Sequence, residues 1–428
     1  MPDFIITGAG IVGLATAYHI IENNSGSSIL IIDKADGPGA GDTSKSAAAF
    51  RAAFTSKINI MLSKSSIDFY YDLQVNKNID LGMRKIGYLF ALDKKEFNKI
   101  EMGIEVAEKM GIEYREIEND LLERNLHMRS SVSSFEEASL IDASDIYKSY
   151  LFQNAGVLDP EKIINYYYNK LKDYGVEFHF GIGIKDFLVE PSRPLGIEGE
   201  PFPWQESKIT GVKLNNGDIV KANKKVIVSL GAWSNLYLNK IGFDTYSRPK
   251  KRQLFSIKAN NPNLKDLLYA KGFNKDNVMP FTILPKGVYI RPNPSEGTFW
   301  IGLSDELGRP IQLDDNPSSE ENFYTYGILP VVSLYFDQLK DQYPYSSWAG
   351  HYDISFDGQP IIYEPFNSNL LISAGTSGSG IMKGDAIGRI TASLALGKDI
   401  TILYDNTEFD TSWLGLENRK IEKELLII

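Results

Sequence analysis

The sequence contains no cysteine among its 428 residues. This absence excludes disulfide bonds, thiolate zinc sites, iron–sulfur clusters and the attachment of a cofactor through a cysteine sulfur. Histidine is also scarce. The four histidines, His19, His127, His179 and His351, are far apart and lack the spacing of metal ligands. We therefore expect no metal site.

Long hydrophobic runs and excess basic charge are lacking too. No apolar stretch is long enough to cross a bilayer, and the first apolar strand begins at Phe4, which leaves no room for a signal peptide. The net charge of −10 argues against nucleic acid as a partner, because phosphate binding needs a basic face. We expect a cytoplasmic protein, with peripheral membrane contact as the alternative and with oligomerisation left open.

The first 33 residues carry the most specific pattern in the chain. Phe4–Ile6 and Ile29–Ile32 are apolar, β-prone runs, and Leu14–Ile21 has apolar residues at helical spacing. Gly8–Gly13, with the sequence GAGIVG, lies between the first run and the helix, and Asp33 follows the second run. A strand, a Gly-x-Gly-x-x-Gly turn, a helix, a second strand and an acid about twenty residues later predict a dinucleotide site.

Each part of this pattern has a physical reason. Gly8 allows the tight turn, Gly10 lets a pyrophosphate approach the backbone, and Gly13 lets helix and strand pack closely. The helix start at Ile11–Val12 offers unpaired N–H groups and a partial positive charge to the phosphates. Asp33 can accept hydrogen bonds from a ribose 2′-OH, and its charge disfavours a 2′-phosphate.

Two later segments also predict helix starts. Thr43–Arg51 places small hydroxyl residues before an alanine run, which indicates either a helix start facing an anion or a plain N-cap. Gly375–Gly380 follows the apolar strand Leu370–Ala374 and precedes a helical pattern over Ile381–Leu396. A second glycine-rich turn this far from the first suggests that the two turns hold opposite ends of one ligand.

The central part of the chain has a different pattern. Between Arg248 and Leu303, four runs of alternating residues predict one antiparallel sheet. These runs are Gln253–Ile257, Thr282–Leu284, Val288–Arg291 and Phe299–Leu303. Glu320–Leu339 predicts a helix bent at Pro330. Pro191–Ser207 carries four prolines and predicts a surface arm or an oligomer contact, and the apolar Leu425–Ile428 is expected to pack on the body or on a partner.

Six stretches together resemble the FAD-dependent amine and amino-acid oxidoreductases of the D-amino-acid oxidase class, which includes glycine oxidase and monomeric sarcosine oxidase. They are Gly8–Gly13 with Asp33, Ser44–Arg51, Ser229–Trp233, Trp348–Asp353, Asp357–Pro360 and Gly375–Met382. Their order and spacing cover nearly the whole chain. Within this class, four stretches look most like the archaeal dye-linked L-proline dehydrogenases of the single-subunit kind: Gly196–Pro201, Ser247–Arg252, Trp348–Phe356 and Gly375–Lys383.

The resemblance implies non-covalent FAD and an α/β fold with an α+β part. It implies a discontinuous Rossmann-like FAD-binding domain of the glutathione-reductase type, residues 1–54, 155–244 and 346–428, and a substrate-binding domain on an antiparallel sheet, residues 55–154 and 245–345. The motifs and the resemblance together give the residues expected to bind FAD. They are Gly8, Gly10, Ile11, Val12, Gly13, Asp33, Lys34, Thr43, Ser44, Lys45, Ser46, Ala47, Ala48, Ile184, Gly231, Trp233, Gly350, Gly375, Ser377, Gly378, Ser379, Gly380, Ile381 and Met382.

An amino-acid substrate brings a carboxylate, which a bidentate arginine pairs best. Arg51 aligns with the substrate arginine of sarcosine oxidase, whereas Tyr352 stands where glycine oxidase has its carboxylate arginine. Arg291 and Lys383 are the other cationic candidates. For each cation the alternative is an ion pair on the surface or between domains.

Three further residues bear on the reaction. Tyr289 is expected either to wall the substrate pocket or to pack in the core, and His351 either to orient the amine, with a role as proton acceptor, or to be a packed histidine. Trp300 stands where sarcosine oxidase has the lysine that activates oxygen, and tryptophan carries no charge. This difference predicts a dehydrogenase that passes electrons to a dye in vitro and to a quinone or similar carrier in the cell.

The favoured hypothesis is the oxidation of L-proline to 1-pyrroline-5-carboxylate. Within the same class, the alternatives are sarcosine, glycine, a D-amino acid or a 2-hydroxy acid. A second alternative places NAD on the Rossmann unit. A third is a flavoprotein subunit that is inactive without a partner.

Overall fold

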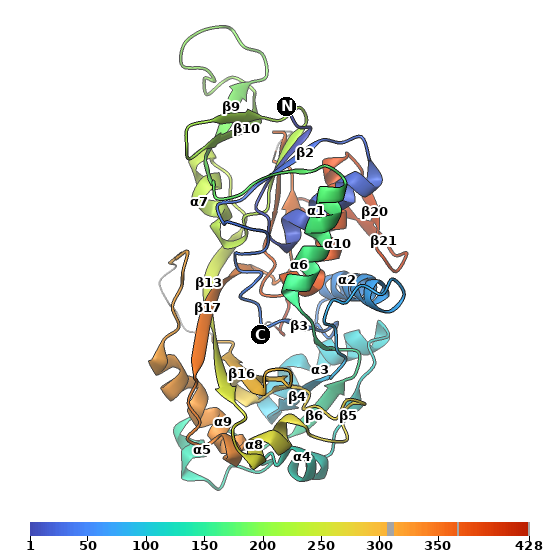
Figure 1. Cartoon of the computed structure of the whole chain (residues 1–428), viewed down its shortest axis with the longest axis vertical. Helices are drawn as coiled ribbons and strands as arrows, with labels where there is room; N and C mark the ends of the chain where they lie inside the picture. The colour runs from blue at the N-terminus through green and yellow to red at the C-terminus, as the bar shows by residue number, and fades with distance from the viewer. Residues whose placement is uncertain (306–311, 366–367, 427–428) are drawn as a thin grey trace.

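Two large sheets lie at opposite ends of the computed structural model, which describes residues 1–305, 312–365 and 368–426 (Figure 1). The first sheet has six strands in the order β18-β19-β12-β1-β2-β8. They are β1 (Phe4–Thr7), β2 (Ile29–Ile32), β8 (Glu177–His179), β12 (Lys225–Val228), β18 (Ile361–Tyr363) and β19 (Leu370–Ala374). Neighbouring strands are parallel except for the antiparallel pair β18–β19.

Both faces of the six-stranded sheet are covered. One face packs on three helices, α1 (Ile11–Asn23), α6 (Pro160–Asp173) and α10 (Gly380–Ala395). The other face packs on the three-stranded sheet of β9 (Ile184–Pro191), β10 (Ser207–Leu214) and β11 (Ile219–Lys221). Strands buried on both sides are continuously apolar, and this explains the runs in β1 and β2. The predicted strand–turn–helix–strand unit is confirmed.

The second sheet has eight strands in the order β17-β13-β16-β15-β14-β4-β6-β5. They are β4 (Tyr88–Leu92), β5 (Arg115–Glu116), β6 (Lys148–Phe152), β13 (Ser247–Lys258), β14 (Phe281–Ile283), β15 (Val288–Asn293), β16 (Thr298–Leu303) and β17 (Ser346–Ser355). The four predicted runs lie in β13, β14, β15 and β16, which pair antiparallel, so this prediction is confirmed. The one parallel pair among the described strands of this sheet joins β14 to β4. The exception arises because β4 reaches the sheet from a distant part of the sequence.

Helices cover the outer face of the eight-stranded sheet, and its aromatic inner face looks toward the first sheet. The covering helices are α4 (Asn119–Leu126), α5 (Glu136–Leu140), α8 (Pro262–Leu268) and α9 (Leu329–Tyr335). Tyr88, Phe90, Phe281 and Tyr289 form the core of the inner face together with residues of α3 (Lys94–Lys109). This inner face is therefore available to form a wall of a site between the sheets.

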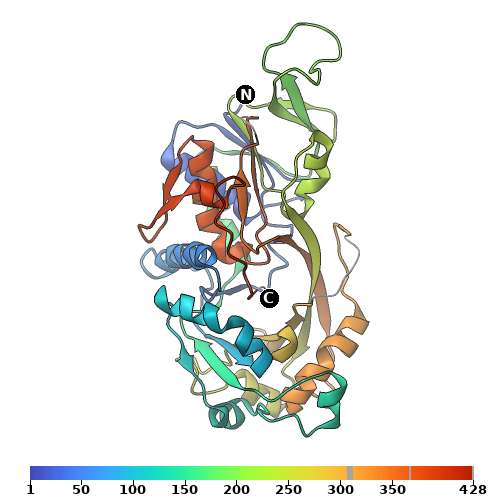
Figure 2. The same cartoon turned by 180° about the vertical axis from the view of Figure 1, so that it is seen from behind.

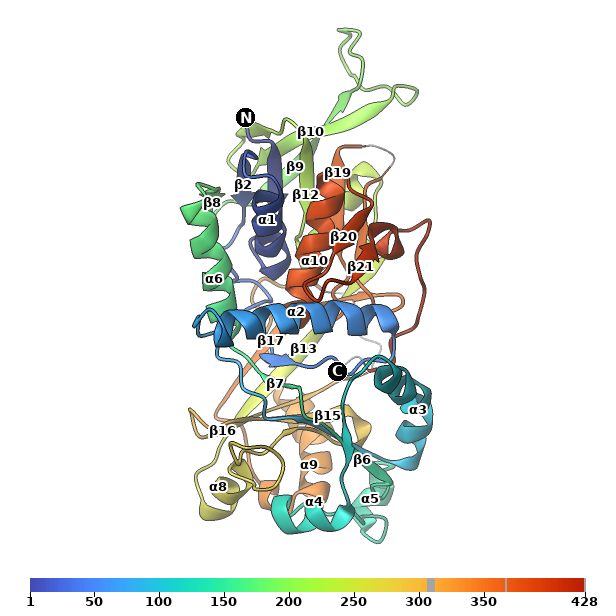
Figure 3. The ribbon, with the colours of Figure 1, turned by 90° about the vertical axis from the view of Figure 1, so that its right-hand side faces the viewer.

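The longest pairing joins the two halves. β13 and β17 pair from Ser247 with Ser355 to Ser256 with Ser346, and Figures 1 and 2 show them side by side, extending from the eight-stranded sheet toward the six-stranded one. α2 (Lys57–Val75) lies across the waist beneath α1 and α10 in Figure 3. The short elements are β3 (Ala49–Phe50) with β7 (Gly156–Val157), β20 (Ile400–Ile402) with β21 (Glu408–Asp410), and α7 (Ser234–Leu238). The division into two domains by residue range stays a prediction.

Two expected helices differ in the structure. Thr43–Arg51 forms turns followed by β3 and not a helix, because Ala48 has a left-handed φ of 55° and Ala49–Phe50 pairs with β7. The expected helix over Glu320–Leu339 is broken into a π-helical turn (Phe323–Ile328), α9 and a 3-10 turn (Asp337–Leu339). Pro330 lies at the junction of the π turn and α9, where a proline breaks regular hydrogen bonding.

The proline-rich segment and the chain's last residues complete the fold. Residues 192–206 form an arm that projects from the β9–β10 end of the molecule (Figures 1 and 3). Leu426 packs against the aromatic inner-face core, whereas Leu425 is half exposed, and residues 427–428 lie outside the described part. Among the described residues, no helix is both long and apolar enough to span a bilayer.

Candidate active site

A cavity of about 400 Å3 opens at the carboxyl ends of the parallel strands. Residues that end or follow β1, β2, β12 and β19 line one side, including Gly8, Asp33, Ser229 and Ala374. Side chains of β13, β15 and β17 line the opposite side. The carboxyl edge of an open α/β sheet is where such folds bind ligands. This cavity, called the larger cavity below, therefore lies between the two sheets.

The glycine turn opens α1 toward the larger cavity. A Cβ on Gly8, whose φ is 101°, would lie 2.3 Å from the carbonyl oxygen of Ser229, and one on Gly13 would lie 2.0 Å from that of Gly8. These two glycines are thus required by close packing. Gly10, the N-cap of α1, has no side chain to cap the helix and lines the larger cavity, so the helix start faces this cavity and is only partly capped, by the Thr43 hydroxyl that accepts the N–H of Ile11 at 3.3 Å.

Asp33 is held at the rim of the larger cavity. Its carboxylate accepts the backbone N–H of Ala9 at 2.6 Å and that of Ala35 at 2.8 Å. The next residue, Lys34, places its Nζ 4.5 Å from the centroid of the Trp233 ring and forms an ion pair with Asp315. Asp315 follows β16 in the sequence, so this pair joins the two halves of the molecule across the cavity.

A second helix start, that of α10, faces the same cavity. Ser379, the N-cap of α10, makes no side-chain cap hydrogen bond, and Gly378, Gly380 and Ile381 line the larger cavity. Two helix N-termini therefore present donor groups and partial positive charge to one space. This arrangement suits a long ligand with electron-rich groups at two places.

Most residues predicted to bind FAD line one of two neighbouring cavities. Those on the larger cavity are Gly8, Gly10, Ile11, Val12, Asp33, Lys34, Thr43, Lys45, Ser46, Ala47, Ile184, Gly231, Trp233, Gly350, Gly378, Gly380 and Ile381. Ser377, Ser379 and Met382 line only the smaller one. Gly13, Ser44, Ala48 and Gly375 line neither, and Ser44 is exposed with its hydroxyl bonded to the carbonyl of Gly41.

The smaller cavity, of about 40 Å3, adjoins the larger one. Both are lined by Ser46, Ala47, Tyr289, Tyr352, Gly378 and Ile381. The remaining wall of the smaller cavity is aromatic and cationic, with Phe54, Tyr88, Phe281, Arg51 and Lys383. A small, largely apolar space with two cations suits a small anionic molecule.

The two cations differ in their surroundings. The guanidinium of buried Arg51 donates to the backbone carbonyls of Ala53 and Leu426 and lies 4.2 Å from the centroid of the Phe54 ring. Burial lowers the pKa of Arg51. Lys383 is fully buried, donates to Asn59 Oδ1 at 2.7 Å, and has its pKa lowered by burial to about 7. Arg51 thus carries a buried charge, Lys383 is only partly protonated near neutral pH, and the carboxylate of Glu424 is the negative group that acts on both.

The predicted tyrosines and histidine lie at different places. Tyr289 and Tyr352 line both cavities, and burial raises the pKa of each phenol. His351 lines only the larger cavity, where its backbone N–H donates to Asp42 Oδ1 at 2.8 Å and its ring packs edge-on against Trp233. Burial lowers the pKa of His351. The structure thus brings Arg51, Lys383, Tyr289 and Tyr352 together and leaves His351 apart from them.

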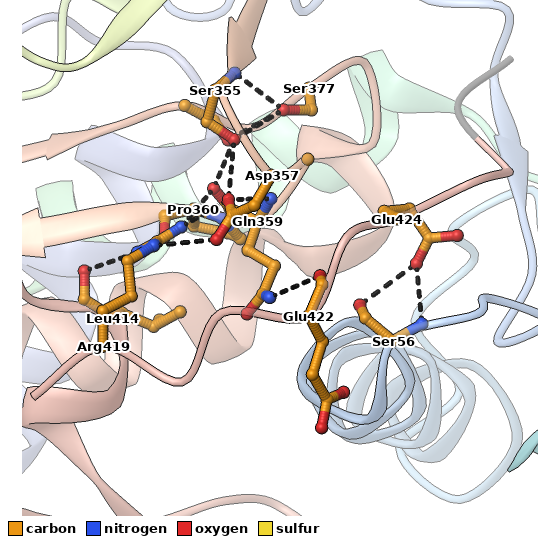
Figure 4. A network of polar contacts seen from close by, with 12 residues as sticks. Ser56, Ser355, Asp357, Gln359, Pro360, Ser377, Leu414, Arg419, Glu422 and Glu424 are labelled. Atoms are coloured by element: carbon orange, nitrogen blue, oxygen red, sulfur yellow. Dashed lines mark hydrogen bonds and ion pairs between the residues drawn. The ribbon is translucent and has the colours of Figure 1, made fainter.

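The segment after Leu414 closes the smaller cavity in a way that the sequence did not indicate. Figure 4 shows Arg419 bonded to Asp357, with Nη2 2.7 Å from Oδ1 and both side chains buried. Farther along, Glu424 accepts hydrogen bonds from the backbone and hydroxyl groups of Thr55 and Ser56. Two buried carboxylates thus fix this segment, so that Glu424 and Leu426 line the smaller cavity.

The other lining residues that sequence reasoning missed fall into two groups. Tyr88 and Phe281 lie on strands of the eight-stranded sheet, where alternation alone could have placed them on one face. Gln253 and Asp315 line the larger cavity, but no local pattern marks them as cavity residues.

Comparison with known proteins identifies the family of the chain. The family model described as "DAO: FAD dependent oxidoreductase" matches residues 3–394. The chain belongs to this family. It is an FAD-dependent oxidoreductase, and FAD is its cofactor. Among the described residues, no group of three or more potential metal ligands is present.

Two curated relatives and one solved structure are similar to nearly the whole chain. Monomeric sarcosine oxidase from Bacillus sp. (strain B-0618) is 23% identical over 440 residues, which cover 99% of this chain and 97% of that protein. Glycine oxidase from Bacillus subtilis (strain 168) is 21% identical over 401 residues, covering 93% and 94%. The crystal structure of L-proline dehydrogenase from P. horikoshii has a TM-score of 0.73 at 22% identity, over 97% of this chain and 96% of that chain. This last likeness shows the fold alone.

The residues of the larger cavity fit FAD. The start of α1 at Gly10 suits a pyrophosphate. The carboxylate of Asp33, which lines the cavity, suits a hydrogen bond from a ribose hydroxyl. The uncapped start of α10, across the cavity, suits negative charge on the flavin ring system. The family match favours FAD over NAD on this unit.

Proposed function

We propose that this FAD-dependent oxidoreductase is a dehydrogenase that oxidises L-proline to 1-pyrroline-5-carboxylate. The observation that carries the proposal is the smaller cavity, which adjoins the larger one and is lined by Arg51, Lys383 and aromatic rings. Its small volume favours a compact amino acid. The choice of L-proline over sarcosine or glycine depends on the resemblance of Trp348–Phe356 and Gly375–Lys383 to L-proline dehydrogenases, because the fold likeness extends to glycine oxidase as well.

When bound, FAD supplies the chemistry by accepting two electrons as a hydride equivalent. The chain's own residues would bind and orient the substrate. Arg51 offers its guanidinium to the carboxylate, in place of the backbone carbonyl of Leu426 that it now contacts. Tyr289 and Tyr352 separate the two cavities and exclude water from the reacting bond.

Lys383 is the candidate to take the proton of the substrate amine. An amine must lose its proton before it can give up a hydride from the adjacent carbon. Because burial lowers the pKa of Lys383 to about 7, its Nζ is neutral in a large fraction of molecules near neutral pH and can accept a proton. His351 lines only the larger cavity, which supports a role beside the cofactor.

A dye or quinone remains the proposed electron acceptor. Trp300 itself provides no charge to activate oxygen. However, the guanidinium of Arg291 lies 4.1 Å from the centroid of the Trp300 ring, so a cation is present nearby. The preference for a dye or quinone therefore depends on the resemblance to L-proline dehydrogenases. We also propose that the protein is cytoplasmic and that the chain is active without a partner subunit.

The test is anaerobic bleaching of the flavin absorbance by single compounds. L-Proline should bleach the band, whereas D-proline, sarcosine and glycine should do so at least about tenfold more slowly at equal concentration. Pyrrolidine, which lacks the carboxylate, should act poorly. Admitting air or adding dichlorophenolindophenol to the bleached protein then separates oxidase from dehydrogenase. Rapid bleaching by sarcosine or glycine but not by L-proline would refute the proposed substrate.

A further inference from the structure

Arg291 is a buried arginine that forms no ion pair with a carboxylate among the described residues, although Glu296 and Asp159 act on it electrostatically. Its side chain is 6% exposed, and its Nε and Nη1 atoms are buried without a hydrogen-bond partner among the described residues. Burial lowers the pKa of Arg291 to about 10. An arginine taken out of water without a carboxylate costs several kcal/mol, so such a residue usually serves a bound negative group.

The alternation of β15 shows which side Arg291 occupies. Val288 and Ile290 belong to the core under the outer helices, whereas Tyr289 belongs to the aromatic inner face. Arg291 therefore shares the inner face with Tyr289. Tyr289 lines both cavities, so the charge of Arg291 lies behind the wall on which the cofactor and the substrate would meet.

Two tryptophans connect Arg291 to the larger cavity. Its guanidinium lies 4.1 Å from the centroid of the Trp300 ring, and Trp300 packs edge-on against Trp348 at 4.9 Å. Trp348 lines the larger cavity and donates its Nε1–H to the carbonyl of Lys45. Arg291 itself lines neither cavity, so its action on a bound group would be through its electric field and not through contact.

We propose that Arg291 is a positioning residue that raises the reduction potential of the bound FAD by holding a buried positive charge behind Trp300. Two-electron reduction of FAD by the substrate adds negative charge to the cofactor, and the electrons then leave to a dye or quinone acceptor. A cation in a low-dielectric wall favours the reduced state because its field is poorly screened there. This inference rests on the proposed placement of FAD in the larger cavity.

The experiment is the midpoint potential of the FAD-loaded protein, measured by equilibration with a reference dye in the absence of any amino acid. Arg291→Met should shift the equilibrium between bound FAD and the dye toward oxidised FAD by about tenfold, which is about 30 mV for a two-electron couple. Arg291→Lys should keep most of the wild-type potential. Arg193→Met, an equal charge change on the projecting arm, should leave it unchanged and controls for net charge.

A potential of Arg291→Met equal to that of the wild type would overturn the inference. If binding of 2-furoate, a carboxylate probe, is then also about tenfold weaker, Arg291 is a substrate-binding residue instead. Should Arg291→Met fail to fold, Arg291→Gln keeps a polar group without the charge and gives the same comparison. Because no amino acid is oxidised in this assay, failure of L-proline as a substrate leaves the test intact.

Discussion

At the scale of single residues, Arg51 combines a buried charge with weak partners. Its guanidinium donates to two backbone carbonyls, and a carboxylate would bind it more strongly than either of them. We expect Arg51→Lys to raise KM for L-proline by about 10–100-fold, with a smaller effect on kcat, because one of two parallel hydrogen bonds is lost. Steady-state kinetics with a dye acceptor measures both. The slow oxidation of pyrrolidine should be unaffected, and an equal loss with pyrrolidine would contradict a carboxylate role.

Lys383 should make stability depend on pH. Its pKa is about 7 in the folded protein and 10.5 in the reference state, so between these values the unfolded chain binds the extra proton. The free energy of unfolding should therefore rise with pH in this window, by at most about 1.4 kcal/mol per pH unit, and show no slope from this group below pH 7. Urea unfolding of the wild type and of Lys383→Met at pH 6.5, 8 and 9.5 tests this.

The difference between the two proteins should grow in favour of the wild type as pH rises. Lys64→Met is the matched control, because ion pairs with Asp68 and Asp405 raise the pKa of Lys64 and keep its titration above the window. A pH-independent difference between wild type and Lys383→Met would show that Lys383 is charged throughout.

Individual residues were predictable where a local pattern carries the chemistry. Gly8, Gly10 and Asp33 were found because a phosphate-binding turn needs glycine and an acid at fixed spacing. Glu424 was not, since its partners Thr55 and Ser56 lie about 370 positions earlier and only folding brings them together. The unpaired state of Arg291 is likewise a property of its surroundings and not of its sequence.

At the scale of elements, β17 shows why an active-site strand is hard to recognise. Its buried positions include His351, Asp353 and Ser355, which are polar, while partly exposed residues alternate with them. The usual apolar alternation is therefore absent, because this strand lines a cavity for a polar ligand. The helix start expected over Thr43–Arg51 does not form, for a different reason. Pairing with β7 and the left-handed Ala48 outweigh the helix propensity of its alanines.

The close contact between α1 and α10 predicts that a larger residue at Gly388 destabilises the protein. A Cβ on Gly388 of α10 would lie 2.6 Å from both the Cβ and the carbonyl carbon of Ala15 in α1, so neither helix can keep its position. Gly388→Ala should lower the free energy of unfolding by about 1–3 kcal/mol despite the better helix propensity of alanine. It should also weaken FAD retention, since α1 follows the turn predicted to bind the pyrophosphate. Gly37→Ala, which meets open space, is the control, and equal stability of the two variants would refute the packing argument.

At the scale of the whole molecule, the proposed FAD site depends on how the two halves meet. Strands of the first sheet end at one side of the larger cavity, and β13, β15 and β17 form the other. The sequence indicated both halves, because each has its own periodicity. It could not indicate the bridges across the cavity, which join residues that are far apart along the chain.

The ion pair of Lys34 with Asp315 is such a bridge, and it predicts how FAD is retained. Lys34 follows Asp33, the residue predicted to bind the ribose, and Asp315 belongs to the segment after β16, so the pair closes the cavity rim from both halves. Exposed pairs contribute about 0–1 kcal/mol, so Asp315→Asn should speed FAD release up to about fivefold. Release is measured by the rise of free-flavin fluorescence after dilution. Because salt screens exposed charges, the effect should vanish near 1 M NaCl. Asp337→Asn, which removes an exposed pair with Arg129 far from the cavity, should release FAD at the wild-type rate. Equal rates for Asp315→Asn and the wild type at low salt would mean that the rim is held by packing alone.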